Sequence, residues 1–168
     1  MDFPFTRLLL ATERTEFDVG AERLALALAR RRAQPLAVVM PLAGNAEFET
    51  VAPALAERAD REAHARLERL LAQARDAGVA IECEVRHGED LFAEIVDDAR
   101  ERQADLIVIR RRGRRSFLAA LMVGEMVGKV IAHAPCSVLV VPRDAQPWQR
   151  RVLVAVEPDD LDRKSTRL

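Results

Sequence analysis

The sequence predicts an α/β domain with an open, parallel, five-stranded sheet that helices cover on both faces. Short apolar runs alternate with segments of helical periodicity, in the order β-α-β-α-β-α-β-α-β. Strands that are joined through helices run parallel and are buried on both faces. The 168 residues are enough for one such domain plus a remainder.

The five predicted strands are aliphatic runs that end at charged or turn-forming residues. The first two read as buried strands, whereas the third alternates between apolar and polar residues and is expected nearer an edge. In chain order they cover Arg7–Thr12, Pro35–Ala43, Val79–Val85, Asp105–Arg110 and Ser137–Pro142.

Four helices are predicted between the strands, from apolar residues at helical spacing. The second has the stripe Leu67, Leu70, Leu71 and Ala74, and Gly78 follows it where a C-terminal cap is expected. In the third, Leu91, Ile95 and Ala99 are expected to face inward, and Glu94, Asp97 and Asp98 to face water. The helices cover Asp18–Arg32, about Pro53–Ala77, His87–Gln103 and about Leu118–His133.

Composition excludes several classes of protein. The net charge of −1 and the aromatic content of 4% argue against a nucleic-acid binder. Two cysteines are no disulfide framework and fit a reducing cytosol, and neither a signal peptide nor a membrane span is evident. We therefore expect a cytoplasmic protein with no membrane partner.

Catalytic and metal-binding patterns are also missing from the sequence. The three histidines share no metal-ligand spacing with the cysteines, and no nucleophilic triad, paired-carboxylate site or P-loop stands out. We expect a protein that is not an enzyme, with slow ATP hydrolysis as the alternative left open.

An arginine-rich loop follows the fourth strand, in the stretch IRRRGRRSFLAALMVGE from Ile109 to Glu125. Ligands of open parallel sheets bind beyond the carboxyl ends of the strands, which is where this loop is expected. Its five arginines could hold a phosphate, contact nucleic acid or face water. They are Arg110, Arg111, Arg112, Arg114 and Arg115.

The stretch DLIVIRRRGRRSFLAALMVGEMVGKVIAHAPCSVLVVP resembles the universal stress protein family, and so does the opening LLLATERTE. HAPCSVLVV is close to that family's HAPCPVLVV. The resemblance covers Phe5 to about Pro142. It implies the strand order 3-2-1-4-5 and a dimer formed along the last strand.

Many members of this family bind ATP through the pattern Gly-x2-Gly-x9-Gly-Ser/Thr, in which backbone N–H groups and a helix N-terminus approach the phosphates. By resemblance, Glu13 stands at the ribose-binding acidic position and Met40 at the adenine contact. Gly113 matches the second glycine, and Gly124 stands for the third, one residue further along. The remaining candidate contacts are Ile109, Arg112 and Met126.

Two positions depart from the pattern: Arg110 replaces the first glycine, and Glu125 replaces the Ser/Thr donor. A carboxylate beside a triphosphate is repelled, and the Arg110 side chain blocks close backbone approach. In one interpretation the arginines replace the glycine cradle, so ATP or another anion still binds. In the preferred interpretation nucleotide binding is lost, and the domain acts through dimerisation or domain pairing.

The end of the chain contains a partial repeat. RVLVAVEPDD at Arg151–Asp160 matches RLLLATERTE at Arg7–Glu16, which suggests a second copy cut off after its first strand. Asp162–Leu168 back-translates as GAT CGG AAG AGC ACA CGT CTG, a match to a widely used sequencing adapter; an ordinary polar tail is the alternative. The expected organisation is a stress-protein domain at 1–143, a linker at 144–150, the repeated strand at 151–161 and a non-native tail at 162–168.

Overall fold

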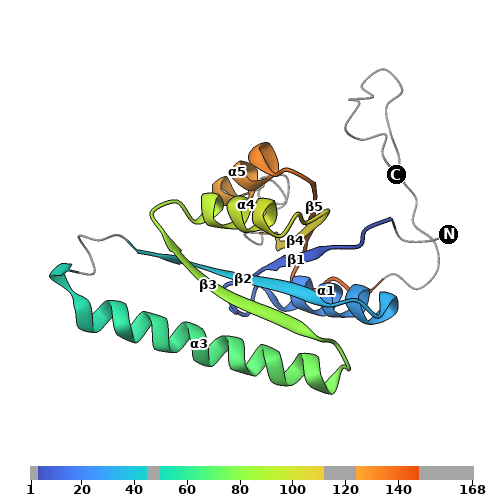
Figure 1. Cartoon of the computed structure of the whole chain (residues 1–168), viewed down its shortest axis with the longest axis horizontal. Helices are drawn as coiled ribbons and strands as arrows, with labels where there is room; N and C mark the ends of the chain where they lie inside the picture. The colour runs from blue at the N-terminus through green and yellow to red at the C-terminus, as the bar shows by residue number, and fades with distance from the viewer. Residues whose placement is uncertain (1–3, 45–49, 112–123, 148–168) are drawn as a thin grey trace.

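The computed structural model describes residues 4–44, 50–111 and 124–147. Within these ranges the chain forms one parallel sheet and four helices, in the predicted order (Figure 1). Short strands and longer helices alternate along the chain. Their bounds are β1 Leu8–Ala11, α1 Val19–Arg32, β2 Leu36–Ala43, α3 Pro53–Asp76, β3 Ile81–Gly88, α4 Leu91–Glu101, β4 Leu106–Arg110, α5 Glu125–His133 and β5 Ser137–Val141.

The strand order β3-β2-β1-β4-β5, with every pair parallel, confirms the predicted fold class. β1 lies at the centre, where Leu8 is level with Leu36 of β2 and with Leu106 of β4. The chain therefore winds outward from β1 in both directions. This arrangement places the ends of β1 and β4 side by side, and a crevice is expected at that point.

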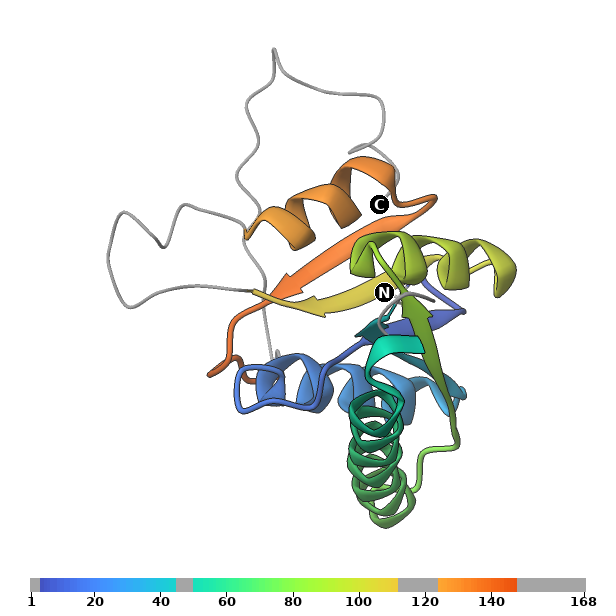
Figure 2. The same cartoon turned by 90° about the vertical axis from the view of Figure 1, so that its left-hand side faces the viewer.

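Two helical layers enclose the sheet. α1 and α3 cover one face, and α4 and α5 cover the other, in both views (Figures 1 and 2). Because side chains alternate along a strand, β1 sends Leu8 and Leu10 toward α1 and α3, and Leu9 and Ala11 toward α4 and α5. The fully buried β1 and β4 thus match the aliphatic runs from which they were predicted.

Ion pairs fill the space between α4 and β3, where the sequence predicted a solvated helix face. Asp98 was expected to face water, and this expectation is wrong: only 1% of the residue is exposed. Its carboxylate accepts hydrogen bonds from Arg102 Nε at 2.9 and 3.1 Å. The reason is that β3 presents Glu82, Glu84 and Arg86 toward α4, so that a charged helix residue finds partners there.

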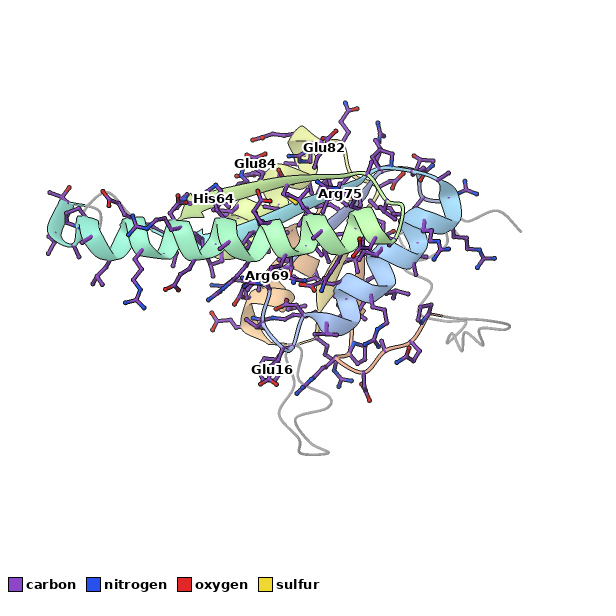
Figure 3. All side chains as sticks on the ribbon, turned by 90° about the horizontal axis from the view of Figure 1, so that it is seen from below. Glu16, His64, Arg69, Arg75, Glu82 and Glu84 are labelled. Carbon is purple, nitrogen blue, oxygen red and sulfur yellow. The ribbon has the colours of Figure 1, made fainter. Side chains whose placement is uncertain are left out.

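The outer edge at β3 is therefore strongly charged. Figure 3 shows Glu82 and Glu84 on the side of β3 away from α3. Arg102 bonds both, at 3.3 and 2.8 Å, and Arg86 bonds Glu101 at 2.8 Å. Charged side chains on an edge strand disfavour pairing with another sheet.

The strand and helix bounds differ from the predictions mainly at β3, α4 and α5. α4 begins at Leu91, because His87 and Gly88, which were predicted as its start, belong to β3. β3 extends to Gly88 and stays paired with β2 well beyond the end of β1. α5 begins at Glu125, and the part of the predicted helix from 118 to 123 lies outside the described residues. Within the described ranges, none of the helices is both long and apolar enough to cross a membrane.

Candidate functional site

The candidate site lies where β1 and β4 end beside the beginning of α1. Leu106 and Val108 of β4 pack on the α1 side of the sheet, so strand alternation directs Arg110 to the same side. The loop from Thr12 to Asp18 leads from β1 to α1 and faces this arginine. The site is thus built from one strand end and one loop about a hundred residues apart in sequence.

Arg110 binds this loop through both terminal nitrogens of its guanidinium group. Its Nη2 donates to Glu13 Oε1 at 2.7 Å, and its Nη1 donates to Thr15 Oγ1 at 2.7 Å and to Asp18 Oδ2 at 3.2 Å. Only 7% of the Arg110 side chain and 1% of the Asp18 side chain are exposed. Charge-assisted hydrogen bonds of this kind are stronger than neutral ones, especially where water is sparse.

Thr15 and Asp18 are also hydrogen-bonded to each other, and these bonds fix the conformation of the loop before α1. The Thr15 backbone N–H and hydroxyl both donate to Asp18 Oδ2, at 2.8 and 2.6 Å. Asp18 precedes the first turn of α1, where a negative charge is favourable beside the positive end of the helix. The loop therefore presents its oxygen acceptors in a fixed arrangement.

A second ion pair lies behind the first. Arg14 bonds Glu22 of α1, and the Thr12 hydroxyl donates to the same carboxylate at 2.8 Å. Burial raises the pKa of the Glu22 carboxyl, and the negative charge of Asp18 adds to this, while Thr12 and Arg14 oppose it. The site thus holds three carboxylates and two guanidinium groups.

Little space remains at this point. The described residues around Arg110 leave a small hollow of about 10 Å³, bordered also by Pro41, Ile109 and Met126. Small-molecule sites usually measure roughly 300–1,000 Å³. The Arg110 guanidinium, rather than an open cleft, therefore occupies the crevice as the described residues form it.

Several residues predicted for the site are not brought together. Met40 is fully buried in the core on the α1 and α3 face, and the next residue, Pro41, borders the small hollow. Gly124 precedes α5, and Glu125 is exposed and pairs with Lys129 at 3.2 Å. Arg112 and Gly113 lie outside the described residues, together with Arg114 and Arg115.

Sequence reasoning missed Thr15, Asp18 and Pro41. Asp18 stands at the start of a predicted helix, and an acidic residue at this position was a usable sequence signal. Thr15 and Pro41 gave no such signal. A larger hollow of about 310 Å³ lies between α3 and the ends of β2 and β3, bordered by Asp60 and His87. Arg110 does not border this hollow, so we assign the site by the chemistry of its residues and not by the volume of the hollow.

No group of three or more residues that could hold a metal ion occurs in the described ranges.

The fold and the crevice define an open parallel α/β protein whose crevice at the ends of β1 and β4 carries an arginine from its own β4. A model of the universal stress protein family matches residues 4–142. The chain belongs to this family, which confirms the resemblance seen in the sequence.

Individual relatives agree with this assignment. The chain is 28% identical over 152 residues to the universal stress protein Sll1388 of Synechocystis sp., covering 82% of this chain and 97% of that protein. The structure of UspA from Lactobacillus plantarum is similar with a TM-score of 0.71 at 20% identity, covering 83% of this chain and 99% of that one. The universal stress protein from Archaeoglobus fulgidus in complex with dAMP has a TM-score of 0.64 at 22% identity, with coverages of 83% and 99%. At such identities the two structures establish the fold.

Proposed function

We propose that this chain is a stress-response domain that acts by pairing with another universal stress protein domain along β5, with its nucleotide site closed. The partner is a second copy of the chain or a following domain of the same kind. The contrast between the two sheet edges is the observation that carries this proposal.

The β5 edge is apolar. Its central residues Val138, Leu139 and Val140 carry no charge, and each remains partly exposed. α5, which packs against β5, adds the exposed Ile131. At the opposite edge, the charged side chains of β3 are bound to α4, so that the apolar β5 edge is the one suited to pairing.

Among the described residues, β5 pairs only with β4, so its backbone keeps pairing capacity on the outer side. Val141 accepts a hydrogen bond from Arg111 N at 2.7 Å and so faces β4. In a parallel ladder alternate residues face alternate sides, which directs the N–H and C=O groups of Val138 and Val140 away from β4. These groups can bond a strand from another domain.

The closed site supports the second half of the proposal. A nucleotide that used Glu13 would have to replace hydrogen bonds between charged groups, each worth roughly 1.5–3 kcal/mol. Arg110 makes two such bonds, to Glu13 and Asp18, and a third hydrogen bond to the Thr15 hydroxyl. Because these bonds must be broken before a nucleotide can bind, closure of the site by Arg110 lowers the affinity for a nucleotide by a large factor.

Sedimentation velocity tests the pairing. We expect the wild-type chain to dimerise and Val140→Pro to be monomeric, because proline removes an outward N–H at an edge where it breaks no bond to β4. Val85→Pro is the matched control: by the same alternation its N–H faces outward on β3, so it should leave the dimer intact. A monomeric wild type, or equal loss of dimer in both variants, would contradict the proposal.

Nucleotide binding is the second candidate function. The Archaeoglobus fulgidus relative was solved with dAMP, and another relative of this fold was solved with cAMP. Isothermal titration calorimetry with ATP and Mg²⁺ distinguishes the two candidates. Saturable binding by the wild-type chain would favour this second function.

A further inference from the structure

We propose that the crevice of this chain is a guanidinium-binding site, which Arg110 fills from within. The inference rests on the closed site of the proposed function and specifies its chemistry. The β1–α1 loop is the receptor, and the ligand class is a planar guanidinium cation rather than a phosphate.

The contacts have the form of a ligand in a binding site. Glu13, Thr15 and Asp18 lie within six residues of one another, and all three accept from Arg110 at distances of 2.7–3.2 Å. Two different nitrogens of the guanidinium are used, one for Glu13 and one for Thr15 and Asp18. A lysine ammonium is a point charge and cannot span these acceptors in the same plane.

Charge selects a cation at this position. Arg14 is bound to Glu22. Among the described residues, this leaves two carboxylates, those of Glu13 and Asp18, facing the guanidinium of Arg110. Removal of that guanidinium leaves these residues with an excess of negative charge in a largely buried position, which attracts cations and repels phosphate.

Asp18 has spare acceptor capacity. Its Oδ1 atom is buried and, among the described residues, has no hydrogen-bond partner. The adjoining hollow of about 10 Å³ is of the size that one water molecule needs. One acceptor oxygen of the loop therefore remains open beside Arg110, as expected of a site for a group rich in N–H donors.

Chemical rescue of Arg110→Ala tests the proposal. We expect the variant to melt at a lower temperature than the wild type, and millimolar guanidinium chloride to restore most of that loss in a saturable manner. Sodium chloride at equal concentration should not restore it. Arg143→Ala is the matched control, because Arg143 also pairs with the same loop, with Glu16 at 3.0 Å, but its side chain is 54% exposed.

The outcomes separate this inference from the proposed function. Rescue of Arg110→Ala but not of Arg143→Ala supports the guanidinium site. The inference is overturned if Arg110→Ala melts at the wild-type temperature, or if guanidinium chloride and sodium chloride have equal effects on it. It is also overturned if the variant binds ATP but is not rescued by guanidinium. If the variant does not fold alone, its refolding yield with and without guanidinium is the readout, and an unchanged yield also overturns it. Sedimentation of the wild type reports separately on pairing, so a monomer with rescue contradicts only the proposed function.

Discussion

Replacement of Arg102 by alanine should strongly destabilise the fold, because it removes the main partner of a buried carboxylate. Asp98 is 1% exposed and receives both of its close hydrogen bonds from Arg102 Nε. Breaking a buried ion pair from one side costs about 3–5 kcal/mol. Arg86, whose Nη1 lies 3.7 Å from Asp98, remains in the variant, and the Arg102 side chain is 26% exposed in the wild type. Both facts favour the lower end of this range, a loss of about 3 kcal/mol in the free energy of unfolding.

Urea unfolding followed by circular dichroism measures this loss. Arg100→Ala is the control on the same helix, because Arg100 pairs with Asp97 at 2.7 Å in an exposed i,i+3 pair. Such pairs contribute about 0.2–1 kcal/mol. The account therefore predicts a loss of free energy of unfolding several times larger for Arg102→Ala than for Arg100→Ala.

The loss should also depend on pH. Burial raises the pKa of Asp98, and Arg102 and Arg86 oppose this while Glu84 adds to it. Because the folded-state pKa lies above the unfolded value, stability from this group is present in acid and is lost as pH rises through the folded pKa. Without Arg102 the folded-state pKa of Asp98 rises further. The loss in free energy of unfolding caused by Arg102→Ala should therefore be large at neutral pH and small near pH ~4. A deficit equal to that of Arg100→Ala, or one that is independent of pH, would show that Arg102 does not stabilise the fold through the buried Asp98 carboxylate.

Two further predictions concern glycines and cysteines. Gly20→Ala should cost about 1–3 kcal/mol in urea unfolding, because a Cβ there would lie 2.0 Å from the Pro142 carbonyl oxygen. Gly128→Ala, with nothing within 4 Å, should gain up to about 1 kcal/mol, and equal effects would contradict this difference. Burial raises the pKa of both Cys83 and Cys136 to about 11, so each thiol should react with a thiol reagent more slowly at neutral pH than free cysteine does; labelling at the rate of free cysteine would be the contrary result.

The core of the fold could be predicted from the sequence because burial on both faces leaves a plain signal. The runs at β1 and β4 are aliphatic throughout and are fully buried, and α3 follows its predicted stripe at Leu67, Leu70 and Ala74. Leu71, also assigned to that stripe, is only partly buried. The strand order came from the family resemblance, since alternation alone fixes parallel strands but not their neighbours.

The polar contacts could not be predicted in the same way. Asp98 has the spacing of a solvated helix residue, and its burial depends on charged residues of β3, which it meets only in the folded sheet. Arg110 was recognised as an obstacle to a nucleotide, but its acceptors lie 92 to 97 residues earlier in the chain. No local pattern connects residues at such separation. Met40 was predicted as the adenine contact, but the residue that borders the small hollow beside Arg110 is its neighbour Pro41. Successive side chains of a strand point to opposite faces of the sheet, so a difference of one residue changes the face.

In the proposed function, Arg110 closes the nucleotide site of this domain. Isothermal titration calorimetry of the wild-type chain with ATP and Mg²⁺ is the decisive test. We expect no saturable heat, because Glu13 and Asp18 are already bound to Arg110. Saturable binding at micromolar concentrations, weakened by loss of Glu13, would contradict this closure.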